Sequence, residues 1–327
     1  MTRPTPPSDT PILSASDPAA LEQAVHILKA GGCVAVPTET VYGLACDATN
    51  ADAVAGVYEA KGRPSFNPLI CHVDTIERAR SLISLNETGE QLARTFWPGP
   101  LTLVAHRQAS SKVSDLAAAG LDTLAVRLPH SDALRTLVTA LDAPLAAPSA
   151  NASGTISPTT AQHVKDSLNG RIHLILDGGA CPVGVESTIV SLLEPEAPAI
   201  LRPGGVAREA LETVCGALGS AGVTNQSAPT APGQLTSHYA PNAKVRLGAT
   251  TPEADESYLG FGSPPKSDGI VFFDLSPSGD LVEAAANLFT GLRWLDSVSD
   301  RIAVAPIPET GLGEAINDRL RRAAAER

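Results

Sequence analysis

Two basic residues of this sequence are spaced so that they could bind one ligand together. Lys61 and Arg63 lie two positions apart in a Lys-Gly-Arg-Pro stretch that follows a predicted helix. The proline favours extended backbone at Arg63, and side chains two apart on an extended segment face the same way. The two cations would repel each other unless an anion lay between them. The pair therefore suits binding of a polyphosphate, and a solvated basic turn is the alternative.

A third cation, Arg127, lies within a predicted strand whose side chains alternate. Leu124 and Val126 occupy the apolar face, whereas Thr123 shares the other face with Arg127. A charge in the middle of a strand is costly unless it is paired, and a guanidinium binds carboxylates in a bidentate manner. Arg127 therefore predicts either a carboxylate ligand or a salt bridge with a protein acid.

Hydroxyl and amide side chains, with one further arginine, gather at the other predicted strand ends, which are favoured ligand sites in α/β folds. They are Thr38, Thr40 and Tyr42 after the first strand, Ser149 and Asn151 after a later one, and Ser187, Thr188 and Arg202 near the last two. Ordinary polar turns are the alternative, and Ser157, just before Pro158, could simply cap the next helix. Taken together, the set suits a polyanion beside a small zwitterion. No Ser-His-Asp or Cys-His arrangement suggests covalent catalysis.

Several common catalytic motifs are missing from the sequence. It has no GxxxxGK[ST] loop, no GxGxxG after a strand, no GxSxG elbow and no HExxH. Its five cysteines are widely spaced without a CxxC pair, which predicts buried, reduced thiols rather than a zinc ribbon. These absences exclude the usual phosphate-loop, dinucleotide and metal-protease sites.

The elements that position these residues alternate between strand and helix. Strands are predicted near 33–37, 69–73, 101–106, 122–128, 144–148, 172–177, 187–193 and 199–202, and helices near 18–30, 52–60, 75–83, 88–96, 131–141, 159–168 and 206–218. We expect a flexible leader over 1–17, an α/β domain over 18–218 and a linker over 219–242. A small α/β domain should follow over 243–327, with strands near 243–247, 269–274 and 301–306 and helices near 280–297 and 313–325.

The bulk composition narrows the function further. Net charge is 24 − 35 = −11, which argues against general nucleic-acid binding, because affinity for the phosphate backbone comes from Lys and Arg. The beginning of the sequence has no apolar signal region, and no run approaches the roughly 20 apolar residues of a membrane span. We therefore expect a cytoplasmic protein that does not contact the membrane.

Seven motifs in order resemble one family. They are PTETVYGL at 37–44, KGRPSFNPLICHV at 61–73, FWPGPLTLV at 96–104, VRLP at 126–129, APSANASG at 147–154, GVESTIV at 184–190 and ILRPG at 200–204. This order resembles the YrdC-like L-threonylcarbamoyl-AMP synthases over nearly all of residues 18–212. The linker and small second domain resemble the long, two-domain form of that family.

The resemblance implies a fold and a reaction. The fold would be a twisted, open mixed sheet with flanking helices and a central ligand cavity, followed by a small Rossmann-like α/β domain. The enzyme would be a nucleotidyltransferase that converts L-threonine, bicarbonate (or CO2) and ATP to L-threonylcarbamoyl-AMP and pyrophosphate. Mg²⁺ would be bound mainly through the ATP phosphates. A tRNA threonylcarbamoyl transferase would use the product to modify adenosine 37 of tRNA, with tRNA binding to this chain weak or indirect.

The resemblance also assigns residues. L-Threonine would contact Thr40, His72, Arg127, Ala147 and Ser187, and ATP would contact Lys61, Arg63, Asn67, Thr123, Ser149, Asn151, Ser157, Arg202, His238 and Tyr239. Lys61, Arg63, Ser149 and Asn151 would be the catalytic set. The linker departs from the family pattern, because the basic and aromatic residues that usually precede His238 and Tyr239 are absent.

Two other functions compete with this one. Related domains occur in hydrogenase-maturation proteins, which makes carbamoyl transfer or carbamoyl-phosphate chemistry the enzymatic alternative, although no acylphosphatase or zinc-finger module is apparent. An RNA-binding module is the alternative from another class. The acidic net charge argues against RNA binding as the main role.

Overall fold

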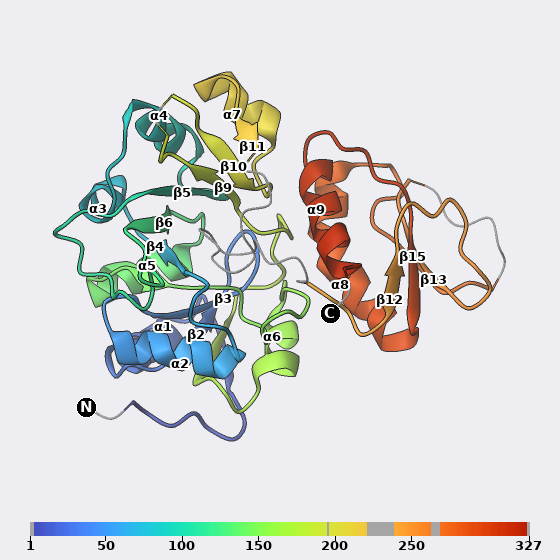
Figure 1. Ribbon diagram of the computed structural model, residues 1–327. Coiled ribbons are helices and arrows are strands. Elements are labelled where there is room, and N and C mark those ends of the chain that lie inside the picture. The colour runs from blue at the N-terminus through green and yellow to red at the C-terminus, as the bar shows by residue number, and fades with distance from the viewer. Residues whose placement is uncertain (1–2, 195, 221–238, 263–268, 326–327) are drawn as a thin grey trace.

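The computed structural model describes residues 3–194, 196–220, 239–262 and 269–325. They form two units that lie side by side (Figure 1). We call residues 3–220 the N-terminal domain and residues 239–325 the C-terminal domain.

The elements of the N-terminal domain are β1 (Ile12–Ser14), α1 (Pro18–Lys29), β2 (Val34–Val36), β3 (Gly43–Asp47), α2 (Ala51–Lys61), β4 (Ile70–His72), α3 (Ile76–Leu82), α4 (Glu87–Phe96), β5 (Leu101–His106), β6 (Thr123–Arg127), α5 (Asp132–Leu141), β7 (Leu145–Ala146), α6 (Ala161–Leu168), β8 (Leu174–Asp177), β9 (Thr188–Ser191), β10 (Ala199–Arg202), α7 (Arg208–Cys215) and β11 (Gly219–Ser220). Those of the C-terminal domain are β12 (Lys244–Arg246), β13 (Ser257–Gly260), β14 (Phe272–Asp274), α8 (Leu281–Val298), β15 (Arg301–Val304) and α9 (Gly313–Ala323).

The N-terminal domain is built on one mixed sheet. Within the described residues it has eleven strands in the order β1-β8-β2-β3-β7-β4-β6-β5-β9-β10-β11. β4 runs parallel to β6, whereas β5 runs antiparallel to it. The predicted mixed sheet with flanking helices is therefore confirmed, and it brings segments far apart in the sequence to neighbouring strand ends.

Helices cover both faces of this sheet, so its central strands are buried on both sides. Val34 and Val36 of β2 pack in a cluster with α1 and α5, whereas Ala35 packs in the cluster that contains α2, α4 and α6. This alternation follows from the period of two along a strand. It also explains why these strands read as continuous apolar runs in the sequence.

Most of the described helices begin where a short polar side chain satisfies free backbone N–H groups, whereas α7 and α9 have no side-chain cap. Asn50 accepts from the N–H groups of Asp52 and Ala53 at the start of α2, and Thr160 accepts from that of His163 at the start of α6. The alternative that Ser157 caps this helix is therefore wrong, since α6 is capped three residues later. Gly62, in a left-handed conformation, ends α2 next to the Lys61–Arg63 pair.

The first residues do not behave as the flexible leader that we expected. Ile12 pairs with Ile175 in a parallel ladder between β1 and β8. Thr10 is buried, and its hydroxyl donates to the carbonyl of Ile172 at 3.1 Å. A three-residue edge strand after a proline-rich stretch carries too little periodicity to be seen in the sequence. β3, β11 and β13 were not predicted either.

The predicted linker is only partly described. Gly219 and Ser220, its first two residues, form β11 and extend the sheet beside β10. Residues 221–238, including His238, lie outside the described residues. The chain is described again from Tyr239, which is buried.

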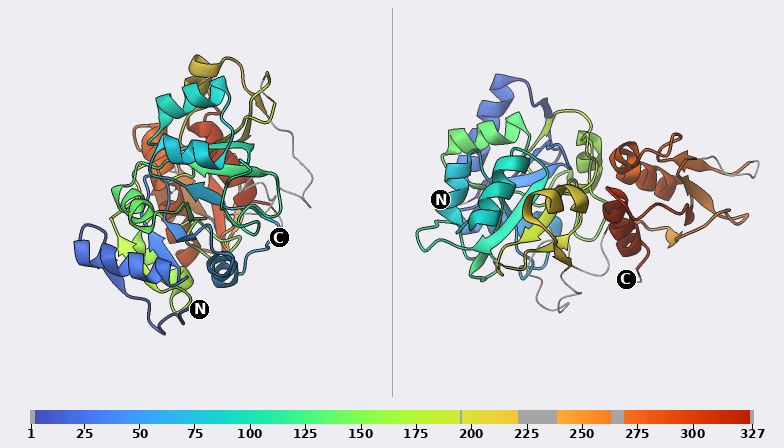
Figure 2. Two further views of the ribbon diagram at one scale, coloured as in Figure 1. Left: turned by 90° about the vertical axis from the view of Figure 1, so that its left-hand side faces the viewer. Right: turned by 90° about the horizontal axis from the view of Figure 1, so that it is seen from above.

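The C-terminal domain is a small parallel α/β unit, as predicted. Its described strands have the order β12-β15-β13-β14 and pair in parallel throughout. α8 and α9 lie between this sheet and the N-terminal domain (Figures 1 and 2). Val41, Ile156 and Val185 of the N-terminal domain share one apolar cluster with residues of these helices, including Phe289. The two domains are thus joined by a common core.

One glycine shows how closely the domains approach. Gly184 has a φ of +75°, and a Cβ built on it would lie 2.4 Å from the carbonyl oxygen of Ala285 and from the Cα of Ala286 in α8. Gly179 has a similar φ of +82° but nothing within 4 Å of a built Cβ. The positive φ disfavours a side chain at both positions. Only at Gly184 would a side chain also collide with the other domain.

We predict that Gly184→Ala lowers the free energy of unfolding by about 2–5 kcal/mol, since backbone strain and a clash with backbone atoms add. Gly179→Ala, the matched control, should cost about 1–2 kcal/mol from the strain alone. Urea denaturation of both variants would measure the difference. Equal losses would show that the domains do not press on Gly184 in solution.

Candidate active site

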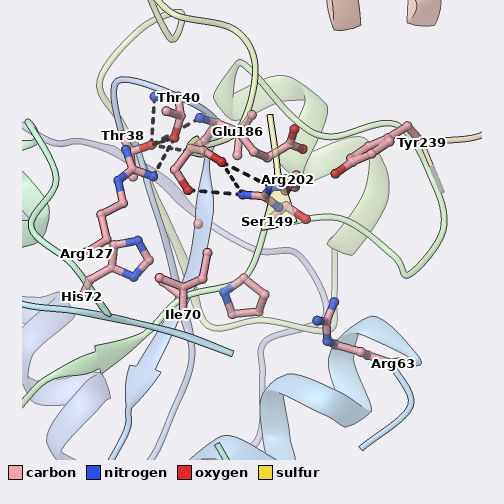
Figure 3. A pocket seen from close by; sticks show the side chains of 15 residues that line it. Thr38, Thr40, Arg63, Ile70, His72, Arg127, Ser149, Glu186, Arg202 and Tyr239 are labelled. Carbon is pink, nitrogen blue, oxygen red and sulfur yellow. Dashed lines mark hydrogen bonds between the residues drawn. The ribbon is translucent and has the colours of Figure 1, made fainter. Parts of the chain in front are cut away.

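A pocket in the N-terminal domain collects most of the residues predicted to bind ligands. Its walls come from strand ends and connections far apart in the sequence, with Tyr239 at one side. The lining residues are Thr38, Thr40, Val41, Gly43, Arg63, Ile70, His72, Arg127, Ala147, Pro148, Ser149, Glu186, Ser187, Arg202 and Tyr239. Figure 3 shows Arg127, Thr40 and His72 on one side of the pocket, and Tyr239 and Arg63 on the opposite side.

Arg127, at the end of β6, is the centre of the first side. Its Nη1 donates to the hydroxyl of Thr40 at 3.0 Å, and its Nε donates to the carbonyl of Gly99 at 3.2 Å. Its Nη2 lies 2.7 Å from Glu39 Oε1, outside the angles of a hydrogen bond. This guanidinium is therefore held in place by protein groups and keeps N–H donors for a ligand.

Glu39 is the protein acid that the sequence left open as a partner of Arg127. Burial raises the pKa of Glu39, but the Arg127 cation and the backbone N–H of His130 outweigh burial and lower it overall. The carboxylate is thus ionised and balances a buried cation. A salt bridge with a protein acid and a carboxylate ligand are compatible roles for Arg127, because one guanidinium can bind both at the same time.

His72 lies beside Arg127 and is neutral. Burial and the nearby Arg127 cation lower its pKa to about 3. Its Nδ1 is buried without a hydrogen-bond partner among the described residues. Such an atom suits a polar ligand group, since an unsatisfied buried nitrogen is costly.

Arg202 and Ser187 form the middle of the pocket. Arg202, at the end of β10, donates from Nη2 to the carbonyl of Ser187 at 2.9 Å and to its hydroxyl at 3.2 Å. The same hydroxyl lies 2.7 Å from that of Thr102. These bonds fix a cation and a hydroxyl at neighbouring points of one wall.

Glu186 is a pocket residue that the sequence analysis did not assign. Its Oε1 accepts from the hydroxyl of Ser157 at 2.5 Å, and its Oε2 accepts from Nε of Arg319 in α9 at 2.7 Å. Burial raises its pKa, but Arg319 and then Arg202 outweigh burial and lower it to about 2. Its position directly before Ser187 could have indicated a pocket residue. Its pairing with Arg319 could not be predicted from the sequence, because Arg319 lies in the other domain.

The Lys61–Arg63 pair is buried, not solvated. Lys61 Nζ donates to the carbonyls of Ser149 at 2.5 Å and Asn151 at 2.6 Å. Burial and then the Arg63 cation lower the pKa of Lys61 well below its usual value. Burial lowers the pKa of Arg63 to about 10. An anion would relieve both groups.

The structure does not place every predicted residue on the pocket wall. Lys61, Asn67, Thr123, Asn151 and Ser157 are buried but do not line it. Lys61 instead holds the backbone of the loop that carries Ser149. The side-chain oxygens of Asn67 and Asn151 are buried without a partner among the described residues.

Comparison with known proteins identifies the family. A family model described as telomere recombination matches residues 26–204, and one described as the threonylcarbamoyl-AMP synthase C-terminal domain matches residues 206–325. The chain is 39% identical to a threonylcarbamoyl-AMP synthase of Bacillus subtilis, covering 96% of this chain and 95% of the relative. It belongs to the threonylcarbamoyl-AMP synthase family.

A solved relative supports the same assignment. The crystal structure of Pyrococcus abyssi Sua5 complexed with L-threonine superposes with a TM-score of 0.85 at 38% identity, covering 93% of this chain and 94% of that one. The threonylcarbamoyl-AMP synthase of that organism is 40% identical over 93% of this chain and 94% of its own. The family likeness therefore spans both domains and the segment between them.

The depressed pKa of Glu186 gives a pH prediction. A carboxyl group with a pKa near 4.5 when unfolded and about 2 when folded adds about 3 kcal/mol of stability above pH 4.5, lost as the pH falls towards 2. The difference in free energy of unfolding between wild type and Glu186→Gln should therefore shrink across that window. Urea titrations between pH 7 and 2 would measure it, with Glu309→Gln, an exposed glutamate, as the control. A constant difference would contradict the prediction.

Proposed function

We propose that this chain synthesises L-threonylcarbamoyl-AMP and pyrophosphate from L-threonine, bicarbonate and ATP, and is thus a nucleotidyltransferase. One observation carries the proposal. A single pocket holds an arginine suited to a carboxylate, Arg127, and two further arginines, Arg63 and Arg202, suited to phosphates. Family membership over both domains supports the same chemistry.

Threonine would occupy the Arg127 side. The guanidinium binds its carboxylate, and Thr40, His72, the backbone at Ala147 and Ser187 surround the rest of the molecule. Since His72 is neutral, it adds no second charge beside Arg127, and its unpaired Nδ1 can form a hydrogen bond with threonine. The amine, once it has lost its proton, is then left to attack the carbon of bicarbonate, and a C–O bond breaks with loss of water to give the carbamate.

ATP would occupy the other side, with its phosphates near Arg63, Ser149 and Arg202. A carbamate oxygen attacks the α-phosphorus, and the bond to the β-phosphate oxygen breaks. Lys61 lies behind the pocket wall, where it would hold the Ser149 loop in place through its two carbonyl partners and add positive charge near the departing pyrophosphate. Catalysis would then rest on positioning and on charge stabilisation by preorganised cations.

Magnesium would enter as part of the nucleotide substrate. Among the described residues no group of three His, Cys, Asp or Glu side chains is placed to hold a metal. The carboxylate on the pocket wall, Glu186, already accepts from Ser157 and Arg319. This donor set fits Mg²⁺ bound through phosphate oxygens, where it neutralises pyrophosphate charge.

The product would pass to a tRNA threonylcarbamoyl transferase for modification of adenosine 37, with tRNA contacting this chain weakly or indirectly. A cytoplasmic location agrees with that role. The described part of the chain contains no helix that is long and apolar enough to cross a membrane.

The test is pyrophosphate release from ATP and Mg²⁺ with threonine and bicarbonate added singly and together. We expect release only when both are present, and faster with threonine than with serine, because the missing methyl group removes apolar contact. No release in any combination by folded protein would reject the proposal. It would favour carbamoyl-phosphate chemistry or RNA binding instead.

A substitution at Arg127 tests the arrangement of the two substrates. We predict that Arg127→Ala raises the Kd for threonine by about 100-fold or more, whereas the Kd for ATP changes little. Calorimetric titration with each ligand would measure both. Since Arg127→Ala leaves Glu39 buried without its cation, the double variant Glu39→Gln/Arg127→Ala should be measured with it, and Glu39→Gln alone is the control. If the affinities for threonine and ATP fell equally in folded protein, the assignment of Arg127 to the threonine site would be wrong.

A further inference from the structure

Arg319 of the C-terminal domain contacts the wall of the pocket from behind. Its side chain is fully buried in the described structure. Its Nε donates to Glu186 Oε2 at 2.7 Å, and its Nη1 donates to the carbonyl of Pro203 at 3.0 Å. One guanidinium on α9 therefore bridges the segment before β9 and the segment after β10.

These two segments carry residues assigned to both substrates. Glu186 directly precedes Ser187, and Pro203 directly follows Arg202. Arg202 in turn donates to the carbonyl of Ser187 at 2.9 Å. The bridge through Arg319 thus closes a ring of hydrogen bonds around the wall that presents Arg202 to the pocket.

Arg319 also contacts the residue at which the chain returns from the segment between the domains. Its guanidinium carbon lies 5.2 Å from the ring centre of Tyr239, which lines the pocket. That ring stacks on Phe289 of α8 at 5.5 Å. Tyr239 is therefore held between two groups of the C-terminal domain.

Simple docking of the domains would not require a buried arginine. The surrounding interface is an apolar cluster, and a buried cation with its partner is often no more stabilising than apolar residues of similar volume. Docking also has polar contacts elsewhere, such as Arg208 with Glu314 at 2.8 Å. The position of Arg319 needs a further reason.

We infer that Arg319 is a positioning residue for the nucleotide, which makes α9 part of the active site and the C-terminal domain a component of ATP binding. The inference rests on the proposed function for the identity of the ligand. The ligand would be a nucleoside triphosphate, because Arg319 supports Arg202 and Tyr239, two pocket residues assigned to ATP.

The experiment measures ATP affinity, with Mg²⁺ and without bicarbonate, in the full chain. We expect Arg319→Met to raise the Kd for ATP by about tenfold or more, because Arg202 and Tyr239 lose their support. The Kd for threonine should change less than about threefold, since Arg127 is untouched and the hydroxyl of Ser187 keeps its contact with that of Thr102. Arg321→Met is the matched control on the same helix, where the native arginine is exposed and pairs with Glu309 at 3.2 Å. It should leave both values unchanged.

Two more variants separate positioning from stability. Arg319→Lys keeps a charge but cannot reach Glu186, Pro203 and Tyr239 together, so ATP affinity should still fall. Glu186→Gln/Arg319→Met removes the unpaired carboxylate and should regain thermal stability relative to Arg319→Met without regaining ATP affinity. If Arg319→Met does not fold, this double variant provides the test.

Unchanged ATP affinity in a folded Arg319 variant, with only the melting temperature lowered, would overturn the inference, since Arg319 would then serve stability alone. The proposed function fails separately. If the wild-type chain binds ATP but releases no pyrophosphate with threonine and bicarbonate, the proposed reaction is rejected. The ATP affinities of the variants can still be compared in that case. A wild-type chain that binds no ATP overturns both.

Discussion

Burial of positive charge around one cavity is the constraint on which the rest of the structure depends. The pocket wall carries three arginines, Arg63, Arg127 and Arg202, against one carboxylate, Glu186. Like charges removed from water are costly unless anions compensate them. Glu39 and Glu186 compensate part of this charge from the protein side, and the excess favours binding of an anionic ligand.

The mixed sheet is what allows these charges to meet. β4, β6 and β10 each deliver a side chain to the pocket, and the connections that follow β2 and β7 supply hydroxyl and small residues. Strand ends serve this purpose because the ladder fixes their backbone while their termini stay free of pairing partners. The Lys61 ammonium adds rigidity by binding two carbonyls of the loop around Ser149.

The C-terminal domain contributes to the balance of charge around the pocket. Arg319 supplies a cation to Glu186, and Phe289 supplies the surface on which Tyr239 stacks. Gly184 allows the domains to approach closely enough for both contacts, since any side chain there would meet α8. A shared apolar cluster then holds the two domains in one arrangement.

The sequence by itself determined the α/β class, most strand and helix positions and the pocket residues from Thr40 to Arg202, because periodicity and motifs are local signals. It missed β1, which is too short to show a period, and it did not assign Glu186. Only the tertiary structure decided which charges pair. Glu39 meets Arg127, and Glu186 meets Arg319 across 133 positions of chain. No local pattern encodes such a pair, since it depends on how sheets and domains bring distant segments together.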